Sequence, residues 1–126
     1  MRCPDCSNVL ITLEFGGFEI DRCFKCHGIW LDSGELECLL GSETGNEYLK
    51  SIKRTVSNER GKKCPICSVK MAKMTIGQHG ILFDRCRDHG IWLDAGELEK
   101  ILRESSADNT GKLINILQEM LSGNRS

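Results

Sequence analysis

Eight residues of this 126-residue sequence form pairs with the spacing of metal ligands. The first half has C-x2-C, sixteen intervening residues and another C-x2-C, and the second half has C-x2-C, eighteen residues and C-x2-H. A C-x2-C turn lets two thiolates reach one ion, and two such turns supply the four ligands of a tetrahedral zinc site. The sequence therefore predicts two Zn2+ ions, bound by Cys3, Cys6, Cys23 and Cys26 and by Cys64, Cys67, Cys86 and His89.

Both predicted sites are structural. Four protein ligands leave no open coordination position for a substrate or a water molecule. Iron is the alternative metal for the first site, because four thiolates also suit it, whereas three thiolates and one imidazole favour zinc. The sequence contains no recognisable nucleophile–base pair and no glycine-rich phosphate loop, so we expect neither an enzyme nor a small-molecule substrate.

The fourth ligand of the first site is either Cys26 or His27. Cys26 is favoured because it keeps the two-residue spacing that His89 shows from Cys86. On that assignment His27 is an exposed neighbour or a hydrogen-bond donor to a ligand.

Disulfides are the alternative use of so many cysteines. Met1 is followed directly by Arg2 and Cys3, with no apolar signal region, and no apolar run approaches the length of a membrane span. We therefore expect a cytoplasmic protein without a membrane partner, in which thiols stay reduced and cysteine pairs bind metal.

The chain repeats itself. Residues 2–40 and 63–102 both contain Cys-Pro-x-Cys-Ser, then Asp-Arg-Cys, then Gly-Ile-Trp-Leu-Asp-x-Gly-Glu-Leu-Glu. Such identity in the same order indicates a duplication in which each copy is one structural unit. At about 40 residues, a unit is near the size at which a metal must supplement the apolar core. In the repeat Cys38 lies opposite Lys100, so we expect a buried or half-buried thiol there and no ligand.

Each copy predicts a β-hairpin between its two ligand pairs and a helix after the second pair. The hairpin strands are expected at 9–15 and 18–22 and at 70–76 and 81–85, around glycine-containing turns. The second turn holds His79, which is not needed as a ligand. Asp32 with Glu35, and Asp94 with Glu97, have the spacing of a capping box that starts a helix. The Trp and Leu before each box are expected to pack in the core.

Two further helices are predicted outside the repeats. Leu49, Ile52 and Val56 have helical spacing within 46–56, and residues 112–121 carry an apolar stripe. The stripe either packs on a unit or contacts another chain.

The order CPxC, hairpin, CxxC, GIWLDxGEL resembles the transcription factor IIB-type zinc-finger family. The resemblance covers 2–40 and 63–102, and the second copy departs from the all-cysteine pattern at His89. It implies a small metal-stabilised α+β fold of two tandem zinc-ribbon-like units, each with two knuckles, a β-hairpin and a short helix. We expect these units at 1–41 and 63–104, a partly helical basic linker at 42–62, and a C-terminal amphipathic helix and tail at 105–126.

The leading functional hypothesis is a protein-interaction module that binds a protein partner or itself, and the family resemblance implies a link to transcription. The first alternative is nucleic-acid binding through basic residues of the linker region, with a steep salt dependence. These residues are Lys50, Lys53, Arg54, Lys62 and Lys63. The second alternative is a thiol switch, in which oxidation ejects zinc and unfolds a unit.

Overall fold

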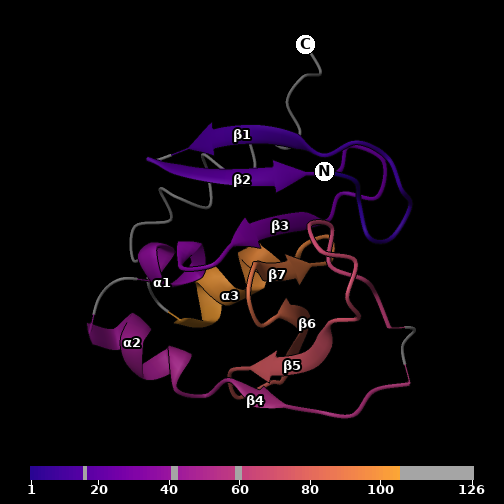
Figure 1. Ribbon diagram of the computed structural model, residues 1–126. Coiled ribbons are helices and arrows are strands. Elements are labelled where there is room, and N and C mark those ends of the chain that lie inside the picture. Colours follow the sequence, from indigo (N-terminus) through magenta and orange to yellow (C-terminus); the bar gives the residue numbers. More distant parts are fainter. Residues whose placement is uncertain (16, 41–42, 59–60, 106–126) are drawn as a thin grey trace.

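The computed structural model describes residues 1–15, 17–40, 43–58 and 61–105 (Figure 1). The helix predicted within 112–121 lies outside these residues. None of the helices in the described part is long and apolar enough to cross a membrane.

All strands of the described residues belong to one antiparallel sheet with the order β1-β2-β3-β7-β6-β5-β4 (Figure 1). Its strands are β1 (Ile11–Phe15), β2 (Phe18–Arg22), β3 (Ile29–Asp32), β4 (Lys53–Arg54), β5 (Ala72–Ile76), β6 (Ile81–Cys86) and β7 (Gly90–Leu93). The hairpins β1–β2 and β5–β6 confirm the predicted turns. Each copy contributes three strands, and β4 comes from the segment between them.

The two copies meet where β3 pairs with β7. Trp30 lies directly opposite Trp92 in this pairing. Because these residues are equivalent in the repeat, an approximate two-fold axis passes between them. We expected two units with separate cores, but a continuous sheet joins them. Neither β3 nor β7 was predicted as a strand, because each is four residues long and its partner lies in the other copy.

One apolar cluster packs against this sheet and draws on both copies. Helix α1 (Glu35–Leu39) contacts β2 and β3, whereas α3 (Glu97–Ser105) contacts β6. The buried members of the cluster are Ile20, Ile29, Leu31, Leu36, Leu39, Leu40, Ile76, Ile81, Phe83, Leu93, Leu98, Ile101 and Leu102. The copies therefore stabilise each other through a shared core.

The prediction that Asp32 caps α1 is wrong. Gly34 occupies the N-cap position with φ of 91°, and no side chain bonds to the helix start. The Asp32 carboxylate instead accepts a hydrogen bond from Trp30 Nε1 at 2.9 Å, and Asp94 accepts one from Trp92 Nε1 at 3.2 Å. A buried indole N–H needs such an acceptor. The aspartates of the repeated motif therefore serve the tryptophans.

The linker is helical only in its first part. Helix α2 (Glu43–Leu49) begins earlier than predicted, and the chain then becomes strand β4 beside β5. Ser51 lies at this change, where its Oγ donates to the Tyr48 carbonyl and accepts from Gly77 N at 2.8 Å. Hydrogen bonds to the edge of β5 thus override the helical spacing of the apolar residues.

Tyr48 connects α2 to α3 through Glu104. The Tyr48 hydroxyl donates to Glu104 Oε1 at 2.6 Å, and His79 Nδ1 contacts Oε2. The hydrogen bond from Tyr48 and the contact with His79 hold the pKa of Glu104 below its usual value.

Tyr48→Phe is expected to lower the free energy of unfolding by about 1.5–3 kcal/mol, because it removes one hydrogen bond to a charged acceptor. Urea denaturation of the zinc-loaded protein measures this change. Glu47→Gln is the control, since its exposed pair with Lys50 contributes little. Equal stabilities for Tyr48→Phe and the parent would contradict the prediction.

Candidate metal centres

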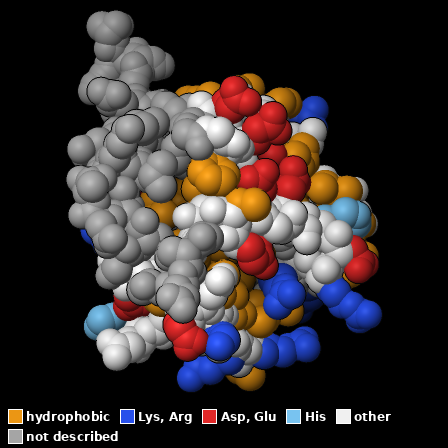
Figure 2. Space-filling model, turned by 90° about the vertical axis from the view of Figure 1, so that its left-hand side faces the viewer, with side chains coloured by type: hydrophobic (Ala, Val, Ile, Leu, Met, Phe, Trp, Pro, Cys, Tyr) orange, Lys and Arg blue, Asp and Glu red, His pale blue; other side chains and the backbone are white. Residues whose placement is uncertain are grey.

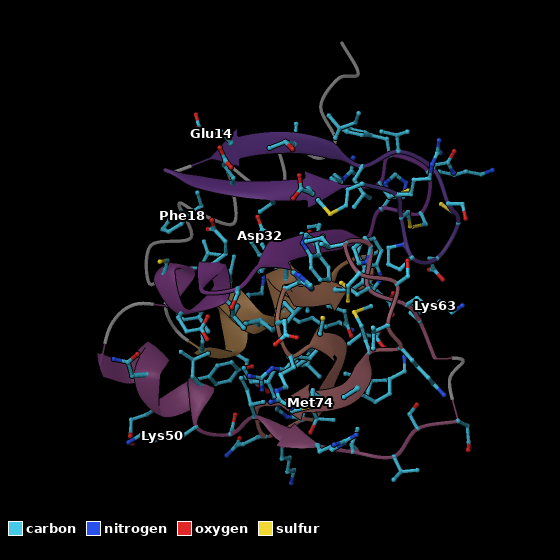
Figure 3. The ribbon with its side chains drawn as sticks, viewed as in Figure 1. Glu14, Phe18, Asp32, Lys50, Lys63 and Met74 are labelled. Atoms are coloured by element: carbon cyan, nitrogen blue, oxygen red, sulfur yellow. The ribbon has the colours of Figure 1, made fainter. Side chains whose placement is uncertain are left out.

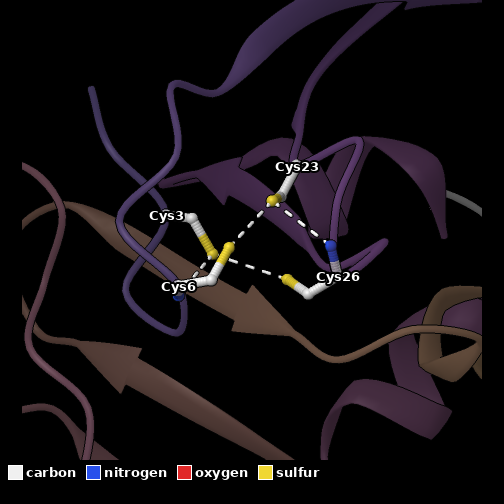
Figure 4. A group of neighbouring side chains, drawn as sticks. All are labelled: Cys3, Cys6, Cys23 and Cys26. Carbon is white, nitrogen blue, oxygen red and sulfur yellow. Dashed lines mark hydrogen bonds between the residues drawn. The ribbon is translucent and has the colours of Figure 1, made fainter.

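The first set of four cysteines converges at one end of the first hairpin (Figure 4). Cys3 and Cys6 come from the turn that precedes β1, and Cys23 and Cys26 from the turn between β2 and β3. Sγ of Cys3 lies 3.5 Å from that of Cys26, and Sγ of Cys6 lies 3.3 Å from that of Cys23. Thiolates at the usual zinc–sulfur distance in a tetrahedron are about 3.8 Å apart. The four sulfur atoms therefore fit one zinc ion after small adjustments.

The second set has the same arrangement with one imidazole. Nδ1 of His89 lies 3.5 Å from Sγ of Cys86 and 3.9 Å from Sγ of Cys64. Sγ of Cys67 lies 3.8 Å from that of Cys86. A tetrahedral zinc site with one imidazole separates nitrogen and sulfur ligands by about 3.6 Å. Three sulfur atoms and one nitrogen thus fit a second zinc ion.

The backbone of each turn favours thiolate ligands. Amides of Asp5 and Cys6 point at Sγ of Cys3 at 3.3 and 3.4 Å, and the Ile66 amide points at Sγ of Cys64 at 3.4 Å. Hydrogen bonds of this kind stabilise the charged form of a ligand. Three ligand pairs are followed by a non-glycine residue with positive φ, which curls the chain around the site. These residues are Ser7, His27 and Ser68, with φ of 67°, 67° and 63°.

Cys26, rather than His27, completes the first site. Its sulfur lies within the group of four, whereas His27 Nδ1 lies 2.6 Å from Nη2 of Arg22. His79 is in neither group and contacts Glu104 instead. Cys38 is also outside both, but the expectation that it is buried or half-buried is wrong. It is exposed because Leu36 and Leu39 form the inner face of α1.

The two sites share an apolar cluster that contains both tryptophans. Its buried members are Cys3, Leu10, Cys23, Trp30, Cys64, Met71, Cys86 and Trp92. Both indoles are completely buried, which confirms their predicted place in the core.

Each tryptophan packs on the other copy. A Cβ at Gly28 would lie 2.2 Å from Cζ2 of Trp92, and one at Gly90 would lie 2.9 Å from Cζ2 of Trp30. Both glycines follow the second ligand pair of their own copy. Sequence reasoning missed this exchange, because the repeat does not indicate whether a tryptophan packs within its copy or across to the other.

Charges around the sites differ between the copies. Beside the second site, buried Asp84 pairs with Lys73 at 2.8 Å and lies 3.9 Å from Lys62. Burial raises the pKa of Asp84, and the two lysines partly offset this effect. Beside the first site, buried Arg22 stacks its guanidinium 4.5 Å from the Phe24 ring centre. Burial lowers the pKa of Arg22, and the negative charge of Cys23 opposes the shift.

The structure does not gather the five basic residues considered for nucleic-acid binding into one free group. Lys62 is bound to Asp94 at 3.0 Å, and exposed Lys50 pairs with Glu47. Lys53 and Arg54 are exposed neighbours on β4. Figure 3 shows Lys50 and exposed Lys63 at opposite sides of the molecule.

Separate substitutions test the fourth ligand. Cys26→Ala is expected to lower the zinc content from two ions to one or none, because three ligands bind structural zinc poorly. His27→Ala is expected to retain both ions. Elemental analysis of the purified variants measures zinc per chain. Loss of an ion in His27→Ala alone would contradict the assignment.

A family model described as a transcription factor zinc-finger matches residues 2–42 and 63–104. Searches of curated proteins and of solved structures give no match. The two matched segments each contain one complete donor set, so the protein binds two zinc ions. Because these segments cover more than half of its length, the chain belongs to the TFIIB-type transcription factor zinc-finger family.

Proposed function

We propose that the protein is a non-enzymatic, zinc-stabilised module that binds another protein. An exposed apolar surface beside the first metal site carries the proposal. It consists of Val9, Ile11 and Phe24, which are 54%, 45% and 45% exposed. Val9 and Ile11 are two residues apart in an extended segment, and Ile11 lies opposite Arg22, whose guanidinium covers the Phe24 ring. We call these three residues the apolar surface.

The second copy does not repeat these three apolar residues at the equivalent positions. Aligning the ligand pairs places Lys70, Ala72 and Arg87 at the positions of Val9, Ile11 and Phe24. The duplication therefore retains the metal ligands in both copies but not the exposed apolar residues, since the second copy instead exposes Ile66 and Val69 at the turn of its first ligand pair. Contiguous exposed apolar side chains are typical of protein-interaction sites.

We further propose that the partner belongs to the transcription machinery and that the module works in a reducing compartment such as the cytoplasm. The description of the matched family supports the first part. The requirement of both sites for reduced thiolates supports the second.

Photocrosslinking from a benzophenone side chain placed at Val9 tests the proposal inside the cells that produce the protein. We expect a discrete crosslinked protein from this position. The matched control carries the same group at Lys70, the equivalent exposed position in the second copy, where no such product is expected. Both variants must retain two zinc ions. Equal products from both positions, or none from either, would contradict the proposal.

Nucleic-acid binding is the second candidate, supported by exposed basic residues at the other end of the sheet. Figure 2 shows most Lys and Arg side chains of its face in the lower half, with acidic ones mostly above. Lys53 and Arg54 lie side by side on β4, and Lys63 faces Lys70 across a β-bridge. A mobility-shift titration at two salt concentrations tests this candidate, and absence of binding at low salt would exclude it.

A further inference from the structure

The outer strands of the two hairpins are equivalent in the repeat but differ in their neighbours. β5 has β4 on its outer side, with Lys53 opposite Thr75 and Arg54 opposite Met74. Among the described residues, no strand lies on the outer side of β1, which forms the end of the sheet. Figure 3 shows Glu14 on this end and Met74 near the other. The second copy thus shows what an occupied edge looks like.

The position of β4 indicates which backbone groups of β1 are available. Thr55 N donates to the Lys73 carbonyl at 3.0 Å, so the backbone of Lys73 and that of Thr75 face β4. Their equivalents in β1 are Thr12 and Glu14, since Ile11 pairs with Arg22 as Ala72 pairs with Arg85. Both residues are exposed. An open edge of this kind accepts an added strand through its backbone groups.

The charges beside β1 indicate which side chains an added strand would carry. In the second copy three lysines neutralise the acidic residues: Lys62 contacts Asp84 and Asp94, Lys73 contacts Asp84, and Lys100 contacts Glu97. The equivalents of these lysines in the first copy are Met1, Thr12 and Cys38, which carry no side-chain charge in their ordinary forms.

The acidic residues themselves are retained in the first copy. Asp21, Asp32 and Glu35 correspond to Asp84, Asp94 and Glu97. Burial and the nearby charges of Asp32, Glu19 and Asp21 raise the pKa of Glu35, as expected for carboxylates that lie together. Glu14 and Glu19 add two acidic residues directly opposite each other on β1 and β2. We call these five residues the acidic group.

We propose that β1 is a docking edge for an extended segment of a partner protein that carries lysine or arginine, added antiparallel to β1 opposite Thr12–Glu14. The proposal rests on the function as an interaction module and specifies the chemistry of its partner. Lys53 of β4 lies opposite Thr75 of β5, and Thr75 is equivalent to Glu14 of β1. A lysine at the matching position of the added strand would therefore lie opposite Glu14, where unlike charges attract across the strands. Pairing of β1 with β1 of a second copy would bring two acidic groups together, and their repulsion disfavours that occupant.

The natural model for the segment is the chain's own β4. A synthetic peptide with the sequence of residues 51–57, Ser-Ile-Lys-Arg-Thr-Val-Ser, is titrated into the 15N-labelled, zinc-loaded full-length protein. We expect the largest amide shifts at Thr12, Leu13 and Glu14. A peptide with both basic residues replaced by Glu is the control, and we expect no shifts of these amides.

Three variants separate the strand pairing from the charge. Glu14→Lys should weaken peptide binding about fivefold or more, because it replaces attraction with repulsion. Glu14→Pro should abolish binding, because it removes an outward N–H that only the added strand would use. Glu47→Lys is the matched control, an exposed charge reversal on α2, and should bind as the parent does. All variants must retain two zinc ions and the parent amide spectrum away from the substituted residue.

Shifts confined to other surfaces, or equal binding by the acidic peptide, would overturn the proposal. A dimer joined through β1 and abolished by Glu14→Pro would also overturn it, since a second copy would then occupy the edge. These results are distinct from failure of the proposed function. A Val9-specific crosslinked protein without peptide binding at β1 would reject the docking edge alone.

Discussion

Removal of zinc from either site is expected to unfold the whole described part of the protein, including the copy whose own four ligands are intact. The physical reason is the shared interior. The sheet is continuous through the pairing of Trp30 with Trp92, and ligands of both sites pack in one cluster. A copy that loses its metal therefore removes packing partners from the other.

The energies favour complete unfolding. Structural zinc contributes about 10–16 kcal/mol to small zinc domains, whereas a domain of this size is stable by only about 5–15 kcal/mol. Loss of one ion thus removes a free energy comparable to the entire stability. We expect a single cooperative transition on chelation.

Cys23→Ala and Cys86→Ala test the two sites separately. For Cys23→Ala we expect loss of amide-exchange protection in β5 and β6 of the second copy as well as in β1 and β2. Cys38→Ala is the control, because this cysteine is exposed and is not a ligand, and it should change the stability by less than about 0.5 kcal/mol. Protection that persists in one copy after loss of the other's metal would show that the copies fold independently.

The metal ligands and the hairpins were predictable because both copies of the repeat contain the same pattern. Cys3 with Cys6 and Cys64 with Cys67 have the same spacing, and the hairpin lies between equivalent ligands in both copies. The same comparison favoured Cys26 over His27. Predictions of this kind depend only on the spacing of residues along the chain, and this spacing can be compared directly between the two copies.

Features that depend on contacts between the copies were not predictable in this way. A single Gly-Ile-Trp-Leu-Asp motif does not reveal that its strand pairs with the other copy of the motif. Asp32 has the spacing of a helix cap, but the buried indole of Trp30 takes its carboxylate. Ile52 has helical spacing, but the open edge of β5 draws the next residues into β4. In each case a tertiary partner overrides a correct local pattern.

Gly28→Ala is expected to destabilise the protein by about 3 kcal/mol or to prevent folding, although it adds only one methyl group. The added carbon would lie 2.2 Å from Cζ2 of Trp92 and within 3 Å of two further indole atoms. Both partners are buried, so neither can move without disturbing the cluster between the metal sites. Overpacking of a close-packed interior costs about 1–3 kcal/mol of stability. We expect a cost near the top of this range because the contact is so short. Denaturant unfolding of the zinc-loaded variant measures the loss.

A double-mutant cycle then identifies the cause as the contact between copies. Trp92→Phe shortens the side chain that blocks the methyl group, so Gly28→Ala should cost at least about 1 kcal/mol less in the Trp92→Phe protein than in the parent. The mirror substitution Gly90→Ala provides the control. Its added carbon would lie 2.2 Å from the Leu31 carbonyl oxygen, and Gly90 has φ of 153°, so Trp30→Phe should leave most of its cost in place. Additive effects of Gly28→Ala and Trp92→Phe would mean that the glycine is needed for a reason within its own turn. If Trp92→Phe lowers the cost of Gly28→Ala whereas Trp30→Phe leaves that of Gly90→Ala in place, Trp92 of the second copy is the group that excludes a larger residue at Gly28. The tryptophan of one copy then limits residue size at the metal-binding turn of the other.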